Sequence, residues 1–245
     1  MSQVIAEPPY DLAEMVKEVR EKAKQLVTED DEPVDNLYSG IQQRLLVEPL
    51  HSSWTPPQTA APRPFLAQSN VGLFFSLRQQ PFVPDMFLSL DVQVDADWAT
   101  THEPRSYFVW EFGKAPEVAL EIVSNRVGRE LSRKLEDYAV AGVAYYVVYD
   151  PWRNLGATEL YVYELATSGA ERRYLRRDDY QLPGVGLSLT LWQGVFEGTN
   201  ARWLRWQDAD GNLIPTGQER AEQEAARAER LAAKLRELGV EPEDV

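Results

Sequence analysis

The segment 117–150 constrains the fold most, because it predicts a strand, a helix and a second strand in succession. EVALEIVS is a short apolar run typical of a buried strand, and residues 128–141 then show helical spacing. Gly142 is placed to end that helix, and AYYVVYD follows as another buried strand. A connection of this kind favours a parallel pair of strands inside a larger mixed sheet.

Short runs of β-branched and aromatic residues predict further strands on both sides of this segment. They are VGLFFSL, VPDMFLSLDV and RSYFVWEFG on the N-terminal side, and ELYVYEL, RRYLRR, GLSLTLWQGVFEG and RWLRWQDADGNLI between residues 159 and 214. We expect the second group to complete the same sheet. The predicted fold class is therefore α/β (α+β), with one mixed central sheet flanked by helices.

Helices are predicted at both ends of the chain. Residues 11–27 have apolar side chains at helical spacing, and a second helix containing Leu37, Ile41 and Leu45 is expected to run to about Glu48 and stop at Pro49.

Residues 218–238 are rich in Ala, Glu and Arg, and their alanines follow alternating steps of four and three. This pattern predicts a protruding helix or short coiled coil. A second copy of the chain is therefore a candidate partner. We expect the helix to contribute to association, or to extend the molecule, rather than to form part of the core. The expected domains are an N-terminal helical extension (1–33), one core domain (34–215) and a charged C-terminal helix (216–245).

Composition narrows the chemistry that a site can use. The chain has no cysteine and 2 histidines, which excludes thiolate sites and disfavours zinc or histidine-based hydrolysis. Carboxylates with Mg²⁺ or Mn²⁺ remain the natural combination.

The net charge of −14 argues against binding a polyanion unless basic residues are locally clustered. The sequence has no signal-peptide pattern and no stretch of about 18 apolar residues, so we expect a cytoplasmic protein without membrane contact.

Two strands carry a carboxylate on a face that is otherwise apolar. Alternation groups Asp85 with Val83 and Phe87, and it groups Glu121 with Ala119 and Val123. A buried charge costs several kcal/mol unless it is paired or binds a metal. The alternatives for both residues are an ion pair with a nearby arginine and a strand edge that is open to water.

Lys134 is a third unusual residue, because it shares one helix face with Leu131, Leu135 and Tyr138. It could instead lay its stem along apolar surface and keep its ammonium in water. Two carboxylates and one ammonium can hydrolyse a phosphodiester: the carboxylates hold a hard cation, and the ammonium orients water or offsets the developing charge.

Four segments resemble the Uma2 family of putative restriction endonucleases in the PD-(D/E)XK superfamily. They are PDMFLSLDV, WEFGKAPEVALEIVS, KLEDYAVAGVAYYVVYDP and the tail RWLRWQDADGNLIPTGQERAEQEAARAE. The resemblance implies a restriction-endonuclease-like fold and a Mg²⁺-dependent DNA endonuclease, with Asp85 and Glu121 as metal ligands and all of Asp85, Glu121 and Lys134 as catalytic residues. The superfamily's usual Glu-x-Lys would place lysine at position 123, which is Val123 here, so the resemblance implies that the lysine has moved to the helix.

Other residues have less specific predicted roles. Arg126, Arg129 and Arg133 are candidates for substrate binding, and Arg172, Arg173, Arg176 and Arg177 form a second basic group that could equally make surface salt bridges. Trp203 and Trp206 could stack bases or pack in the core. Tyr138, Gly142 and Tyr146 are interpreted as packing and turn residues, Ser124 as a capping residue, and Glu48 as a solvated residue or an outer carboxylate of the site.

Two other functions stay open. The chain could be a non-catalytic interaction protein that retains the nuclease fold and acts through its C-terminal helix. Asp85 and Glu121 could also be a glycosidase pair, which would require a sugar-sized cleft without a lysine between them.

Overall fold

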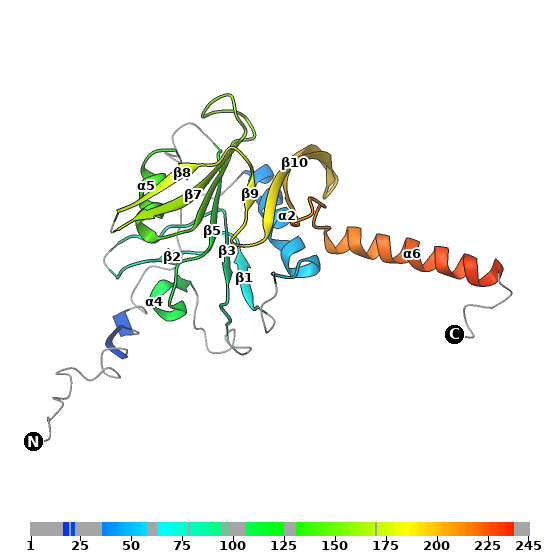
Figure 1. The fold of residues 1–245 in the computed structure, drawn as a ribbon, viewed down its shortest axis with the longest axis horizontal. Helices are drawn as coiled ribbons and strands as arrows, with labels where there is room; N and C mark the ends of the chain where they lie inside the picture. The colour runs from blue at the N-terminus through cyan, green and yellow to red at the C-terminus, as the bar shows by residue number, and fades with distance from the viewer. Residues whose placement is uncertain are drawn as a thin grey trace, which may run out of the picture.

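The computed structural model describes residues 17–19, 21–22, 36–57, 63–77, 79–94, 97, 106–124, 131–169 and 171–237. A six-stranded sheet of order β1-β3-β5-β6-β7-β8 forms its centre (Figure 1). The strands are β1 (Phe65–Gln68), β3 (Met86–Leu90), β5 (Val118–Ile122), β6 (Tyr145–Tyr149), β7 (Leu160–Ser168) and β8 (Glu171–Arg176). The mixed α/β sheet expected from the sequence is confirmed.

The predicted strand–helix–strand unit is present, and β5 and β6 are parallel neighbours in register Val118↔Tyr145 to Ile122↔Tyr149. The connecting helix is α5 (Arg133–Ala141). It begins later than expected, because residues 131–132 form a turn, while residues 128–130 lie outside the described residues. Gly142 ends the helix at a φ of 88°, where its N–H donates to the carbonyl oxygens of Tyr138 and Ala139. A residue with a Cβ would be strained in that conformation.

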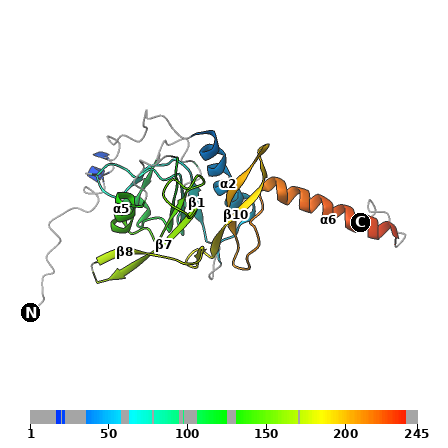
Figure 2. The ribbon, with the colours of Figure 1, turned by 90° about the horizontal axis from the view of Figure 1, so that it is seen from above.

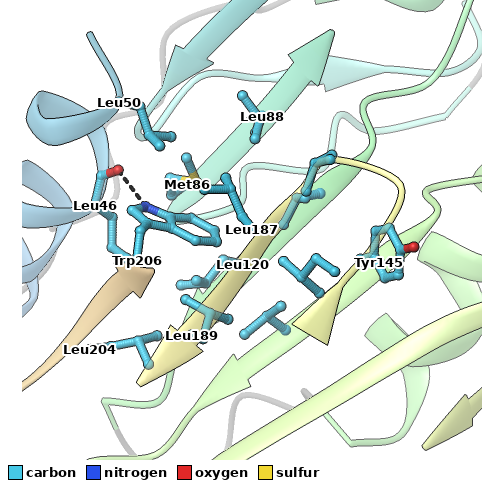
Figure 3. Close-up of a cluster of buried hydrophobic side chains, with 14 of the residues drawn as sticks. Leu46, Leu50, Met86, Leu88, Leu120, Tyr145, Leu187, Leu189, Leu204 and Trp206 are labelled. Atoms are coloured by element: carbon cyan, nitrogen blue, oxygen red, sulfur yellow. Dashed lines mark hydrogen bonds between the residues drawn. The ribbon is translucent and has the colours of Figure 1, made fainter. Parts of the chain in front are cut away.

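Each face of the central sheet covers its own apolar cluster, as the alternation of the strands predicts. Met86, Leu88, Leu120 and Leu46 belong to one cluster, drawn in Figure 3. This cluster is covered by α2 (Leu37–Ser53) and by a second sheet, and the indole N–H of Trp206 donates to the carbonyl oxygen of Leu46 at 2.8 Å. Phe87, Ala119, Val123 and Tyr138 belong to the cluster on the opposite face, beneath α5. The sheet is therefore buried on both faces.

The second sheet corrects one expectation. β7 and β8 do extend the central sheet, but β9 (Gln181–Leu182), β10 (Leu187–Phe196) and β11 (Thr199–Gln207) form a separate three-stranded antiparallel sheet of order β11-β10-β9. Leu189, Leu204 and Trp206 bury their side chains against the first apolar cluster. These strands pack on the face of the central sheet instead of pairing with its edge, because their apolar side chains can be buried there.

Two predicted strands are much shorter than the sequence suggested. VGLFFSL contributes β2 (Leu73–Phe74), and RSYFVWEFG contributes β4 (Tyr107–Phe108), which pairs with β2 in parallel. The chain then turns into the one-turn helix α4 (Val109–Phe112), which ends at Gly113 with a φ of 74°. Aromatic contacts such as Phe74–Phe108, with ring centroids 5.0 Å apart, hold this region together.

The second helix continues past Pro49, so the predicted stop at that residue is wrong. α2 starts at the cap Asn36, whose side chain accepts from the Ser39 N–H at 3.0 Å, and it ends at Ser53. Proline inside a helix costs about 3 kcal/mol. The burial of Leu46, Pro49 and Leu50 beneath this stretch offsets that cost.

The C-terminal helix α6 (Gly217–Glu237) has no buried residues and extends away from the rest of the molecule (Figures 1 and 2). Only its first turn is attached among the described contacts. Glu219 accepts two hydrogen bonds from Arg205, at 2.8 and 2.6 Å, and the side chain of Arg205 is 3% exposed. Glu48 is exposed, as its interpretation as a solvated residue predicts, and it accepts from the Gly217 N–H at 2.9 Å, so it connects α2 to α6.

Two truncations are expected to behave differently because of this attachment. Removing residues 221–245 should leave the melting temperature nearly unchanged, since α6 buries no side chain. Removing residues 218–245 also deletes Glu219 and leaves the buried Arg205 guanidinium without its carboxylate, which should cost about 3–5 kcal/mol. Thermal unfolding of both proteins checks this, and equal melting temperatures would show that Glu219 does not stabilise the core.

Most of the predicted N-terminal helix at residues 11–27 lies outside the described residues; residues 17–19 and 21–22 are helical. Across the ranges that the structure describes, no helix is both long and apolar enough to span a lipid bilayer.

Candidate active site

Asp85 lies immediately before β3, at the end of the strand that is next to β5. Met86 faces Leu120 in the antiparallel β3–β5 pair, so Asp85 and Glu121 are the next two residues in register. The Asp85 carboxylate is buried and accepts from two donors: the backbone N–H of Ile122 at 2.6 Å and the side-chain amide of Gln43 at 2.8 Å. These bonds attach it to β5 on one side and to α2 on the other.

Glu121 occupies β5 and is 4% exposed. Its Oε2 accepts from the Lys134 ammonium at 2.9 Å, and its Oε1 accepts from the Tyr138 hydroxyl at 2.9 Å. Both donors come from the same face of α5, one turn apart. The sequence had left open whether the relocated lysine returns to the acid, and in the structure it does. The alternative for Glu121 was an ion pair with an arginine, whereas the cation that pairs with it in the structure is Lys134.

The register of β3 and β5 brings Asp85 opposite Glu121, and the negative charges of both act on Tyr138. Phe87, Ala119 and Tyr138 belong to a common cluster. Burial raises the pKa of Tyr138 well above 10, and the negative charges of Glu121 and Asp85 add to the effect. Tyr138 therefore stays protonated and can donate to Glu121 throughout the ordinary pH range.

Lys134 combines a buried contact with partial access to solvent, because its side chain is 38% exposed and that of Glu121 is 5% exposed. Leu131 and Leu135 pack against the cluster beneath it. The prediction that Lys134 shares the inward helix face is confirmed. The ammonium therefore contacts the Glu121 carboxylate and remains partly accessible to solvent.

Three residues of the site were missed or misinterpreted from the sequence. Gln43 and Asn70 form an amide pair: Asn70 donates to Gln43 Oε1 at 2.9 Å, and Gln43 Nε2 lies 3.3 Å from Asn70 Oδ1. Gln43 is 4% exposed, and a polar residue on the apolar side of α2 was a signal that could have been used. Tyr138 was interpreted as packing, although it also donates to Glu121.

The predicted basic residues are only partly placed. Arg126 and Arg129 lie outside the described residues. Arg133 is exposed and lies 3.5 Å from Asp137, an ordinary surface pair one turn along α5. In the second group, Arg177 pairs with Glu164 and Asp179, and Arg172 donates to the Val140 carbonyl oxygen at 3.1 Å. The salt-bridge interpretation of that group is confirmed for Arg177.

The two tryptophans proposed for base stacking are buried. Trp203 is stacked on Tyr38, with ring centroids 4.9 Å apart, and Trp206 packs beneath α2. Both are at most 1% exposed, so in this structure neither ring can stack a base. Both tryptophans therefore pack in the core, which was the alternative interpretation.

Asp85 and Glu121 are the two carboxylates that the site could offer to a hard cation. No group of three histidine, cysteine, aspartate or glutamate side chains in the part of the chain that the structure describes could hold a metal. Mg²⁺ usually keeps several waters and takes one or two carboxylates together with substrate phosphate oxygens. Asp85 and Glu121 match that requirement, and hydrogen bonds to ligand carboxylates, such as those from Gln43 and Tyr138, are normal at metal sites.

Comparison with known proteins identifies one family. The model of Uma2, described as a putative restriction endonuclease, matches residues 33–191. This span contains Asp85, Glu121 and Lys134, together with the central sheet and both helices that border the site. A search of curated proteins finds no match.

Proposed function

The chain belongs to the Uma2 family of putative restriction endonucleases, and on this premise we propose that it is a metal-dependent DNA endonuclease. In this proposal Asp85 and Glu121 hold Mg²⁺ or Mn²⁺, and Lys134 is the catalytic cation. The observation that carries the proposal is the 2.9 Å contact between Lys134 and Glu121 beside the register partner Asp85. It brings the ammonium to Glu121, while the register of β3 and β5 brings Asp85 to the same end of the sheet.

Each of these residues has a separate part in hydrolysis. The bound cation would polarise the phosphoryl group and lower the pKa of bound water. Asp85 is held for this purpose by the Ile122 N–H and by Gln43, while Tyr138 fixes one oxygen of Glu121. Lys134, partly exposed, orients the attacking water or offsets the charge that develops on the phosphate. No covalent intermediate is required.

One observation favours a second candidate, a non-catalytic interaction protein that keeps the nuclease fold. All four oxygens of the two carboxylates accept from protein donors: those of Asp85 from Gln43 and Ile122, and those of Glu121 from Tyr138 and Lys134. A site held together by these bonds alone would not need a metal. The glycosidase alternative lacks its stated requirement, because a lysine is bound to one of the two carboxylates.

A cleavage assay tests the proposal. Purified protein is incubated with supercoiled plasmid, linear duplex and single-stranded DNA in Mg²⁺, Mn²⁺ or EDTA, and Mn²⁺ binding is measured by calorimetry. We expect cleavage that requires the divalent cation and is lost in Asp85→Asn, because one of the two metal ligands is then neutral.

Asp91→Asn is the matched control. Asp85 directly precedes β3 and Asp91 directly follows it, and Asp91 forms an exposed ion pair with Arg63 at 2.6 Å. This variant should cleave like the wild type. A wild-type protein that neither binds Mn²⁺ nor cuts any of the DNA forms would support the non-catalytic alternative.

A further inference from the structure

Trp152 presents its ring to solvent in the loop that follows β6. The residue is 48% exposed, which makes it unlike the buried Trp203 and Trp206. Its ring is in contact with that of Tyr38 at a centroid distance of 5.2 Å and an interplanar angle of 58°. Tyr38 in turn stacks on Trp203 and donates to the Arg202 carbonyl oxygen at 2.6 Å. An exposed indole is thus supported from behind by packed aromatic residues.

The loop that carries Trp152 is held in a defined conformation. The Arg153 N–H donates to the Asp150 carbonyl oxygen at 3.1 Å, and the Leu155 N–H donates to the Asp150 carboxylate at 2.6 Å. Arg153 has a φ of 54°, in the left-handed region that few residues other than glycine adopt. The indole therefore does not have to be ordered when a ligand binds, which reduces the entropic cost of binding.

Two arginines lie near Trp152: Arg153 is the next residue, and the Arg202 carbonyl oxygen accepts from Tyr38, whose ring contacts Trp152. Arg153 and Arg202 lie 3.5 and 3.2 Å from the two carboxylate oxygens of Glu159, and their side chains are 56% and 51% exposed. Both guanidinium groups pair with Glu159 and stay about half exposed, so each can still reach a phosphate, while the Asp150 carboxylate is turned to the Leu155 N–H.

α2 connects this cluster to the candidate active site. Tyr38 near its start contacts Trp152, and Gln43 holds Asp85. Gln43 is five positions after Tyr38, which is about 7.5 Å along the helix axis. The pairing of β5 with β6 leads to the same conclusion. Tyr149, at the end of β6, lies opposite Ile122, the residue that follows Glu121. Trp152 and the carboxylates therefore lie along the same end of the sheet.

We propose that Trp152, Arg153 and Arg202 form a binding site for an unpaired base of single-stranded DNA beside the candidate active site. The indole stacks on the base, and the arginines face the adjoining phosphates. In a duplex both faces of a base are covered by its neighbours, so an exposed ring can stack only on a base that has left the helix. The inference rests on the proposed nuclease function for its link to cleavage, and it assigns DNA with an unpaired segment as the substrate class.

Binding can be measured without cleavage. Fluorescence anisotropy in EDTA measures the affinity of each protein for a labelled single-stranded 20-mer and for the matched blunt duplex. The proteins are the wild type, Trp152→Ala and Trp152→Phe. Trp152→Ala should weaken single-strand binding by about 5- to 100-fold, while Trp152→Phe keeps most of it and duplex binding hardly changes. Val195→Ala is the control, because Val195 is another exposed apolar residue but lies on β10.

Arg202→Gln provides a second test that does not alter the aromatic ring. It should reduce the slope of log affinity against log salt for the single strand by about 0.7, as expected for the loss of one phosphate contact. Equal single-strand affinity of the wild type and Trp152→Ala, or no single-strand binding by the wild type, would overturn the inference. So would an equal loss of affinity for both DNA forms.

The outcomes separate this inference from the nuclease proposal. A protein that binds single strands through Trp152 but cuts no DNA with Mg²⁺ or Mn²⁺ supports the binding site and contradicts the nuclease. Metal-dependent cutting by Trp152→Ala, with single-strand affinity equal to that of the wild type, supports the nuclease and contradicts the binding site.

Discussion

Lys134→Met should lower the rate of DNA cleavage by about two to four powers of ten, if its ammonium activates water or stabilises the transition state. The substitution keeps an apolar stem of similar length against Leu131 and Leu135 while removing the charge. Because Asp85 and Glu121 remain, Mn²⁺ binding should be retained. Single-turnover plasmid nicking measures the rate, and calorimetry measures the metal affinity.

Lys114→Met is the matched control for that variant. Lys114 also forms an ion pair with a largely buried glutamate, Glu117, but this pair lies at the other end of β5. If both lysine variants lose activity to the same extent, the loss comes from general destabilisation. If neither loses activity, Lys134 is not a catalytic residue.

Glu121→Gln should abolish divalent-metal binding and cleavage while costing little stability. The glutamine has nearly the same size, and its amide oxygen can still accept from the Tyr138 hydroxyl, which burial keeps protonated. Lys134 loses its anionic partner, but its side chain is 38% exposed and water can solvate the ammonium. A residue held for function is seldom optimal for the fold, so its replacement need not be costly.

Three measurements on Glu121→Gln check this prediction: Mn²⁺ binding by calorimetry, the melting temperature and plasmid nicking. Glu117→Gln is the control, because it removes the carboxylate that pairs with Lys114 and should leave metal binding intact. Wild-type nicking by Glu121→Gln would mean that the cleavage comes from another site or from a contaminating enzyme.

The parts of the site that follow strand and helix periodicity could be predicted from the sequence. Alternation grouped Glu121 with Ala119, and this is confirmed because Tyr138, which donates to Glu121, shares the cluster of Ala119. Asp85 lies just before β3 and contacts Gln43 of α2. The helical period placed Lys134 with Tyr138, and both donate to Glu121. The two groupings hold within one element, so they do not depend on how the elements pack.

The remaining features depend on contacts between elements that are distant in the sequence. The helical period could have singled out Gln43 as a polar residue on the apolar side of α2, but it does not identify the partners, which are Asp85 across 42 residues and Asn70 across 27. Pro49 was expected to end α2, but the tertiary burial of the following turn outweighs its local cost. The strands β9 to β11 have ordinary strand patterns that do not say whether they pair with an edge or pack on a face.

The site is divided between a local and a distant part of the chain, which matters for the order in which it can assemble. Glu121 finds Lys134 after 13 residues and Tyr138 after 17, within the β5–α5–β6 unit. Asp85 contacts Ile122 across 37 residues and needs the antiparallel docking of β3. Closing the longer loop has the higher entropic cost. A partly folded chain with β3 undocked can therefore carry the lysine–glutamate pair without its second carboxylate. By mass action, a cation held by both carboxylates would stabilise only the states in which β3 has docked.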